Sequence, residues 1–251
     1  YYSDQFPARD FFVGLKGVTE IAMLKGENND VVLGKDGYLL DLLPFFSEEH
    51  IAKLEAKGLI NLAWNENGFR ELTNSKREVA SVADVAGLKI RTMENANHMA
   101  FWTAIGAEPT PLAWAEVYFA LQSGTIDAQE NAADTCASAN FHEVQKYLSC
   151  TNHILYNNVI LMNADKYASL DPAYQAALDQ AVAEAIAELR PQLADLDASN
   201  KAKLAEGGMT ITEYPAEFYD SILALDAVKA LYEKIDADVN GLGTALQNAL
   251  A

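Results

Sequence analysis

The apolar residues near the start of the chain recur at helical spacing. Phe11, Leu15, Val18 and Ile21 lie three or four positions apart, which predicts a helix from about Ala8 to Lys25. The apolar positions that follow predict a short strand, Val31–Leu33, and then a helix that starts after Ser47, about Glu48–Lys57, and is closed by Gly58.

From Leu59 onward, short apolar runs alternate with amphipathic stretches. The expected strands are Leu59–Trp64, Phe69–Thr73, Leu88–Arg91 and Glu108–Leu112. The expected helical segments are a turn at Val82–Gly87, Ala96–Ile105 capped by Asn95, about Glu116–Gln122, and a helix through Val144 and Tyr147. Strands and helices that alternate with short loops are typical of parallel pairing with crossover helices, so the pattern predicts an α/β fold.

The last third of the chain is mostly helical in its pattern. A β-branched and aromatic run, His153–Met162, predicts one long strand or two. Asp171 and Pro172 have the residue types of a cap and a first helical position, and Pro191 should end or kink the long helix that follows. The remaining expected elements are a helix to Leu204 closed by Gly207–Gly208, a strand at Met209–Thr212, and a last amphipathic helix at Phe218–Ile235.

The charge balance limits the possible partners. With 18 Lys and Arg against 36 Asp and Glu, the 251-residue chain has a formal net charge of −18. A surface of this sign disfavours nucleic acid and anionic lipid, and the many large apolar residues exclude a disordered acidic tail. No apolar run approaches the ~20 residues that a membrane helix requires, so we expect a chain that is not embedded in a membrane.

Cysteine and histidine add little chemistry. Two cysteines exclude a disulfide scaffold and a zinc ribbon, and the sequence leaves open whether Cys136 and Cys150 pair. The histidines lack the spacing of metal ligands, so structural or exposed positions are expected for His98, His142 and His153. We expect neither a metal nor a cofactor.

The basic residues are unevenly spread. Arg70, Lys76, Arg77, Lys89 and Arg91 fall within 22 residues, and no Lys or Arg follows until Lys146. Arg91 stands at the C-terminal end of a predicted strand, the edge at which open α/β sheets bind ligands. A guanidinium there can hold a carboxylate through two parallel hydrogen bonds. The structural alternative is a strand-end arginine paired with Glu94 or Asp84, and position alone leaves the two equal.

Four motifs in a fixed order resemble those of TRAP-transporter solute-binding proteins of the DctP type. They run from about Phe46 to near Thr212 and comprise Glu66–Arg77 (ENGFRELTNSKR), Gly87–Thr92 (GLKIRT), Pro109–Asn131, and Phe141–Leu148 followed by Thr151–His153. The resemblance implies two α/β lobes of the type II periplasmic-binding-protein kind, with long C-terminal helices. It also implies an extracytoplasmic, non-enzymatic and monomeric protein that closes on a small organic acid and delivers it to a membrane permease.

The resemblance also implies the ligand-binding residues. Arg91 matches the family's carboxylate-clamping arginine and Arg70 a second ligand-site arginine, while Asn131 matches the asparagine of the QEN motif and Trp114 the aromatic before EVY. Glu94, in the turn after Arg91, completes the predicted set. The residue types alone also allow a structural role: Trp114 could pack in the core, and Asn131 could serve in a loop or as a helix cap. The loops depart from the family at Met93, Ala128 and Ala132, where proline, glycine and proline are usual.

The first forty residues fit this resemblance less well. Ser3–Asp10, Gly26–Asn29 and Gly34–Tyr38 resemble the start of DHHW proteins, relatives of the SGNH-like alginate-acetylation proteins. We therefore expect a junction of two families near Asp41–Phe46 and a shortened first lobe. An SGNH-like hydrolase or acetyltransferase, or a folded chimera without ligand binding, are the alternative functions. No GDS block or DHHW string is present to support the chemistry.

The expected organisation has three segments. Residues 1–87 form an atypical, shortened part of the N-terminal lobe, and residues 88–212 form the βαβ ligand-binding lobe with return strands and a long hinge helix. Residues 213–251 form C-terminal helices that pack on the first lobe. The sequence given begins at Tyr1 and contains no signal peptide, so the extracytoplasmic location is an expectation from the resemblance alone.

Overall fold

A six-stranded mixed sheet is the centre of the fold. The computed structural model describes residues 10–14, 20–24, 54–238, 241 and 244. The strand order is β5-β4-β6-β3-β7-β8, with bounds β3 Leu59–Asn74, β4 Lys89–Thr92, β5 Glu108–Pro111, β6 Ala128–Ala132, β7 Tyr147–Asn163 and β8 Thr210–Thr212. Strand β4 is parallel to β5 and β6, as the alternating pattern predicted, whereas β3 is antiparallel to both of its neighbours.

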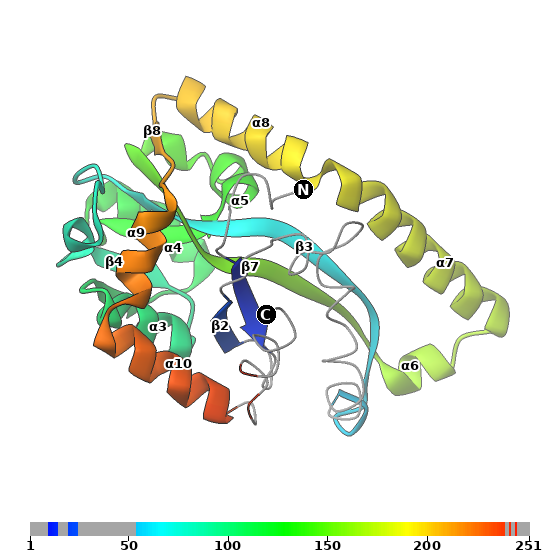
Figure 1. The fold of residues 1–251 in the computed structure, drawn as a ribbon. Coiled ribbons are helices and arrows are strands. Elements are labelled where there is room, and N and C mark those ends of the chain that lie inside the picture. The colour runs from blue at the N-terminus through cyan, green and yellow to red at the C-terminus, as the bar shows by residue number, and fades with distance from the viewer. Residues whose placement is uncertain (1–9, 15–19, 25–53, 239–240, 242–243, 245–251) are drawn as a thin grey trace.

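Strands β3 and β7 form a long antiparallel ribbon (Figure 1). The sequence predicted two strands where the structure has the single 16-residue β3. The two predicted strands join into one because the pairing with β7 continues through three register shifts. They lie between Asn61 and Ala63, Glu66 and Phe69, and Arg70 and Leu72. Gly68, in the middle shift, has a φ of 78°, which only glycine adopts without strain.

The helix predicted through Val144 and Tyr147 is wrong. The structure has a short helix, α5 Ala133–Ser138, a 3₁₀ turn, η3 Phe141–Glu143, and then β7, which already starts at Tyr147. Tyr147 pairs with Asn74 at the end of β3 and with Thr210 of β8. Ladder hydrogen bonds from two neighbouring strands therefore outweigh the local helical pattern.

Helices cover both faces of the sheet (Figure 1). The remaining helices are η2 Val82–Val85, α3 Ala96–Ala104, α4 Trp114–Ser123, α6 Ala164–Ala168, α7 Pro172–Leu189, η4 Arg190–Gln192, α8 Leu193–Glu206, α9 Ala216–Leu223 and α10 Asp226–Asp238. One core contains Leu72 of β3 with residues of α3, α9 and α10. The second contains Leu148 of β7 with residues of α4, α5 and α8. Leu148 is in register with Thr73, the neighbour of Leu72, so the two cores lie on opposite faces.

The predicted helix boundaries are confirmed where a cap or proline marks them. Asn95 accepts hydrogen bonds from the N–H groups of Asn97 and His98 at the start of α3. Asp171 accepts one from Ala173, with Pro172 at the first position of α7. The 3₁₀ turn η4, which contains Pro191, separates α7 from α8. These residue types act through local backbone geometry, which is why the sequence alone located them.

The predicted last helix at Phe218–Ile235 is two helices, α9 and α10, separated at Ala224–Leu225. Their buried residues Phe218, Ile222, Val228, Leu231 and Ile235 belong to the same core. The apolar spacing continues across the break, so the pattern alone does not reveal the turn.

The predicted N-terminal helix at residues 8–25 is wrong in its described part. Residues Asp10–Gly14 and Glu20–Leu24 form two antiparallel strands, β1 and β2. Aromatic and β-branched residues favour strands, and Gly14 and Gly17 disfavour a helix interior. The predicted strand at residues 31–33 and most of the helix at 48–57 lie outside the described residues, although Gly58 has the expected positive φ of 70°. The domain boundaries stay predictions.

Candidate ligand-binding site

Arg91 lies near the C-terminal end of β4, with its side chain almost fully buried. It is 4% exposed, and its Nε donates a hydrogen bond of 2.9 Å to the carbonyl of Leu112. The guanidinium carbon lies 5.7 Å from the centroid of the Trp114 ring. The terminal nitrogens Nη1 and Nη2 have no hydrogen-bond or ion-pair partner among the described residues. One nitrogen therefore fixes the side chain, and two charged donors stay available.

The electrostatic surroundings of Arg91 are unfavourable for an unpaired charge. Burial lowers the pKa of its guanidinium, as does the charge of Arg70, whereas Glu130 raises it. An arginine remains protonated at neutral pH in spite of such shifts. A buried cation without a bound anion costs folding free energy, so an anion that reaches the two free nitrogens would be strongly favoured.

The structural alternative for Arg91 is not found. The Asp84 carboxylate accepts hydrogen bonds from the backbone of Ala80 and Ser81 at the start of η2. Glu94 is exposed, and no ion pair joins it to Arg91 within the part of the chain that the structure describes.

Arg70, on β3, lies opposite the C-terminal end of β6 and is bound by Glu130. Its Nε is 2.6 Å from Glu130 Oε2, and its Nη2 donates to Glu130 Oε1 at 2.9 Å and to the Glu130 carbonyl at 2.8 Å. Both side chains are fully buried. The third nitrogen, Nη1, is buried and has no partner in the described structure, and the guanidinium lies 4.6 Å from the Tyr156 ring centroid. Arg70 is therefore largely neutralised by protein.

His153 extends this ion pair. Its Nε2 lies 3.1 Å from Glu130 Oε2, and its Nδ1 lies 2.8 Å from Thr151 Oγ1. Burial lowers the pKa of the imidazole although Glu130 opposes the shift. A neutral ring that donates from Nε2 and accepts at Nδ1 satisfies both contacts. Burial alone would raise the pKa of Glu130, but Arg70 and His153 hold it well below its ordinary value.

Two aromatic rings of α3 pack against His153, which belongs to the charged cluster of Arg70, Glu130 and His153. The His153 ring stacks on Phe101 at 5.8 Å and meets the edge of Trp102 at 4.8 Å, both on α3. His98, one turn before Phe101 and Trp102, is also buried, and burial together with the nearby arginines lowers its pKa to about 4. The burial of His98 and His153 agrees with the predicted structural role. The contact of His153 with the Glu130 carboxylate was not predicted.

Strand register places the two arginines on opposite faces of the sheet, at the end of the sheet where β4 and β6 finish. Arg91 is in register with Gln129, whereas Arg70 bonds to the side chain of the next residue, Glu130. Arg70 itself pairs with Ala132, at the C-terminal end of β6. Since β4 and β6 are parallel, both predicted arginines lie where these strands end.

Asn131 is a buried strand residue and not a loop or cap. Its Nδ2 donates to Gln129 Oε1 at 2.9 Å, and Gln129 Nε2 donates in turn to Thr73 Oγ1 at 2.8 Å. The chain of amide and hydroxyl groups fixes the orientation of the Asn131 side chain. It lies on the same face of β6 as Gln129, the register partner of Arg91.

Trp114 is the first residue of α4 and is 48% exposed. The centroid of the Trp114 ring lies 5.7 Å from that of Phe141, and the guanidinium of Arg91 also lies near the ring. Plain core packing would leave a tryptophan covered. The half-exposed ring next to a cation is instead available to a ligand.

A second buried charge group, which sequence reasoning missed, includes Glu71, the register partner of Asn131. Lys201 of α8 contacts Glu71 at 3.5 Å and Asp197 at 2.8 Å. Burial raises the pKa of Glu71 to about 7 against the opposing effect of Lys201. Glu71 also accepts a 2.9 Å hydrogen bond from the backbone of Asn152. These contacts connect α8 to the strand that carries Arg70.

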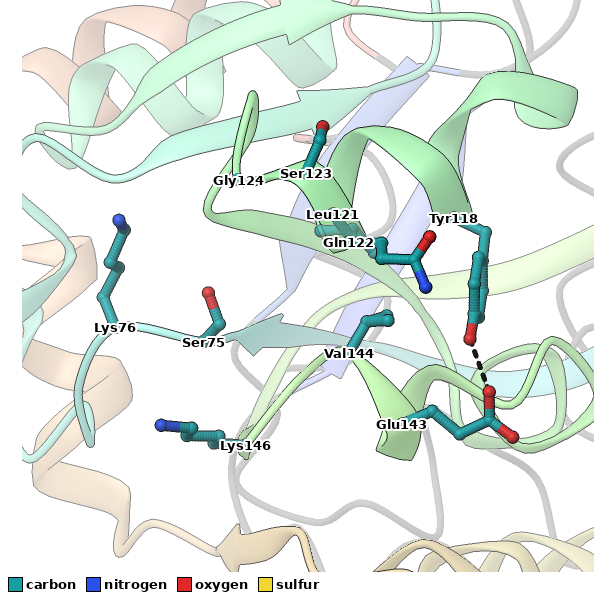
Figure 2. A pocket seen from close by; sticks show the side chains of 10 residues that line it. All are labelled: Ser75, Lys76, Tyr118, Leu121, Gln122, Ser123, Gly124, Glu143, Val144 and Lys146. Atoms are coloured by element: carbon teal, nitrogen blue, oxygen red, sulfur yellow. Dashed lines mark hydrogen bonds between the residues drawn. The ribbon is translucent and has the colours of Figure 1, made fainter.

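A separate hollow of about 580 Å³ opens beside α4 and η3 (Figure 2). Tyr118 donates a hydrogen bond to Glu143 across it, and Lys76 and Lys146 lie at the other end (Figure 2). Lys76 is paired with Asp127 at 3.1 Å. None of the five predicted ligand residues lines this hollow.

Other classes of site find no support in the described residues. No group of three or more His, Cys, Asp or Glu side chains there could hold a metal ion. Cys136 and Cys150 are free thiols, and both are buried. None of the helices within the described ranges combines the length and apolar character needed to cross a bilayer.

Comparisons with known proteins agree with the geometry. Residues 44–237 match the model of the family DctP, described as bacterial extracellular solute-binding protein, family 7. The 2,3-diketo-L-gulonate-binding periplasmic protein YiaO of Escherichia coli is 38% identical over 193 residues, which cover 71% of this chain and 58% of YiaO. The chain thus spans little more than half the length of the curated relatives that it matches.

Solved structures show the same fold. A sugar acid binding protein from Advenella mimigardefordensis, in complex with galactonate, superposes with a TM-score of 0.76 at 27% identity and covers 90% of this chain and 70% of its own. A TRAP periplasmic solute binding protein from Bordetella, with density assigned to pantoate, gives a TM-score of 0.74 at 33% identity, with 88% and 72% covered. The fold is that of the α/β, two-lobed periplasmic binding proteins.

Proposed function

The chain belongs to the DctP family of bacterial extracellular solute-binding proteins, and from this premise we propose that it binds a small organic carboxylate and delivers it to the membrane permease of a TRAP transporter. Members of the family are solute-binding proteins and not enzymes. The proposal assigns the protein an extracytoplasmic location and a monomeric state, and it involves no cofactor.

The state of Arg91 is the observation that carries the proposal. Its guanidinium is buried, fixed by Leu112 and backed by the Trp114 ring, and its two terminal nitrogens have no partner in the described structure. A carboxylate accepts two parallel hydrogen bonds from the planar fork of a guanidinium. Binding of such an anion would convert an unfavourable buried charge into a paired one.

The other predicted residues have distinct roles in this proposal. We assign Arg70 a secondary role, since Glu130 largely neutralises it and Nη1, its one nitrogen without a partner in the described structure, is buried. Asn131 presents a side chain oriented by Gln129. Trp114 covers the carbon body of the ligand, and Glu94 lies in the turn beyond Arg91.

The ligands of relatives define the compounds to test. The related proteins described above are associated with 2,3-diketo-L-gulonate, galactonate and pantoate, and each of these compounds carries a carboxylate and oxygen-rich carbons. We propose the same broad class of organic acid for this chain. The alternative of an SGNH-like hydrolase or acetyltransferase, or of an inert chimera, has no support in the comparisons.

A thermal-shift screen tests the proposal. An acid present at ~100 times its Kd stabilises the folded state by about 2.7 kcal/mol, which raises the Tm of a chain of this size by roughly 5–10 °C. Sugar acids, hydroxy acids and keto acids should include at least one compound with a saturable shift of this order. If none of these acids raises the Tm, the proposed function is wrong.

Trp114 provides a separate prediction. Replacing Trp114 with alanine should weaken binding of the best acid by about 5–20-fold, since the ring contributes contact area and a cation–π contact to Arg91. Isothermal titration calorimetry measures the change. The matched control is Phe119→Ala on the same helix, which removes a 70% exposed ring and should leave Kd within twofold. Equal losses in the two variants would exclude Trp114 as a wall of the site.

A further inference from the structure

Four buried, uncharged side chains form a hydrogen-bonded relay that ends at Asn131. The relay consists of Gln145, Thr73, Gln129 and Asn131, and all four residues are at most 4% exposed. Thr73 of β3 and Gln129 of β6 are register partners, whereas Gln145 lies in the short loop between η3 and β7. Of the four, Asn131 alone is a proposed ligand residue, so the others can influence a ligand through it.

The backbone sets the direction of the relay at the end far from Asn131. Gln145 Nε2 donates to the carbonyls of Val144 at 3.1 Å and of Asp127 at 3.4 Å. Because a carbonyl oxygen accepts hydrogen bonds and never donates them, the Gln145 amide has its nitrogen on this side and its oxygen on the other. That oxygen, Oε1, accepts the single hydroxyl proton of Thr73 at 3.0 Å. The Thr73 oxygen is therefore an acceptor for its second partner.

The same requirement passes from Thr73 to Asn131. Gln129 Nε2 donates to Thr73 Oγ1 at 2.8 Å and also lies 3.4 Å from Cys136 Sγ. Both amide protons of Gln129 are thus engaged, and its Oε1 accepts from Asn131 Nδ2 at 2.9 Å. A reversed Asn131 amide would place its oxygen against the oxygen of Gln129, which is costly in a buried site. One orientation of the Asn131 amide is therefore favoured.

The Asn131 side chain has hydrogen-bonding capacity left for a ligand. Its bond to Gln129 is the one side-chain hydrogen bond that it makes within the described residues, so its second amide proton and its Oδ1 have no partner there. An amide that is already fixed loses little conformational entropy when a ligand binds to it, whereas a freely rotating amide must first be ordered. The relay thus preorganises Asn131.

We propose, on the basis of the function proposed above, that Thr73 and Gln145 are positioning residues of the ligand site, which hold the Asn131 amide in the orientation that the bound acid requires. The competing interpretation is that the relay only satisfies buried polar groups and stabilises the sheet. The two interpretations differ in whether the effect of Thr73 on binding depends on Asn131.

The experiment is a double-mutant cycle on the Kd of one acid. Galactonate, pantoate and 2,3-diketo-L-gulonate are measured first, and if none of them binds, the tightest acid of the thermal-shift screen is the probe. Titration calorimetry compares the wild type, Thr73→Val, Asn131→Ala and the double variant. Thr73→Ser is the conservative variant that keeps the hydroxyl group. Gln145→Leu, alone and with Asn131→Ala, gives a second cycle in case Thr73→Val does not fold.

A control is needed because each relay variant also leaves buried polar groups unpaired and lowers stability. Val228→Ala removes buried methyl groups from the core that contains α10, on the opposite face of the sheet from Thr73 and Leu148. It lowers stability without touching the relay. Thermal unfolding confirms that each variant is folded at the temperature of the titration.

Thr73→Val should weaken binding about 5-fold, the usual effect of one hydrogen bond, while Thr73→Ser and Val228→Ala stay within about twofold of the wild type. Asn131→Ala should weaken binding about 10-fold, and adding Thr73→Val to it should cost less than about twofold more. Gln145→Leu should show the same dependence on Asn131.

Three results would overturn the inference and leave carboxylate binding intact. They are wild-type affinity in Thr73→Val or in Asn131→Ala, an equal loss from Thr73→Val with and without Asn131, and an equal loss in Val228→Ala. Absence of binding by every acid of the screen to the wild type contradicts the proposed function itself.

Discussion

Replacing Arg70 with methionine should lower the free energy of unfolding by about 3–5 kcal/mol. The guanidinium is 1% exposed and makes three hydrogen bonds to Glu130. Methionine fills a similar volume but leaves the fully buried Glu130 carboxylate with only His153 as a partner for its charge. A buried charge that loses its counterion costs far more than the pair contributes when intact. Denaturation in urea, followed by tryptophan fluorescence, measures the loss.

A double variant separates this charge effect from poor packing. Arg70→Met with Glu130→Leu removes both charges, and we expect it to recover at least half of the loss caused by Arg70→Met alone. Losses that simply add would show that the two residues act independently. The wild type should also lose stability as the pH falls below about 4.5, because the folded-state pKa of Glu130 lies below its ordinary value and protonation breaks the pair. Glu130→Gln should show a shallower decline in that range.

Replacing Arg91 with methionine should weaken binding of the best acid by at least about 100-fold, or about 2.7 kcal/mol. The two free terminal nitrogens are the charged donors that the ligand carboxylate needs, and no other described side chain offers a matching pair. Arg91→Lys keeps the charge but loses the planar fork, so we expect an intermediate loss. Titration calorimetry measures all three proteins.

Stability should change in the opposite direction at Arg91. An unpaired buried guanidinium destabilises the ligand-free protein, so Arg91→Met should leave its Tm unchanged or raised. The matched control is Arg77→Met, an arginine whose side chain bonds to the carbonyls of Asp84 and Ala86 and not to the site. It should keep the wild-type Kd. A large affinity loss in both variants would point to general disruption rather than to an anchor at Arg91.

Sequence patterns located elements wherever a local signal governs the backbone. Asn95 and Pro172 act within one turn of a helix, and the predicted starts of α3 and α7 follow from them. Long-range pairing decided the failures. Tyr147 is in β7 because it pairs with Asn74 of β3 and Thr210 of β8, and residues 10–14 pair with 20–24 although their apolar spacing fits a helix. Such pairing depends on residues far away in the chain.

The features of the candidate site also fall into those that the sequence predicted and those that depend on long-range contacts. The sequence predicted the position of Arg91 at a strand end, and the order of the motifs matched it to the carboxylate-binding arginine of the family. What the sequence could not show is that Glu130 already pairs with Arg70, since the two are 60 positions apart. A signal was present: Gln129, Glu130 and Asn131 are consecutive polar residues between alanines. In a strand buried on both faces, each of these side chains requires a partner.

The central claim is that the carboxylate of the ligand binds Arg91. The most direct measurement is a thermodynamic cycle by titration calorimetry, with wild type and Arg91→Met on one side and the best acid and its uncharged carboxamide on the other. We expect the wild type to prefer the acid over the amide by at least about 100-fold, and Arg91→Met to show almost no preference. A wild type that binds acid and amide equally well, or a variant that keeps the full preference, would contradict the account.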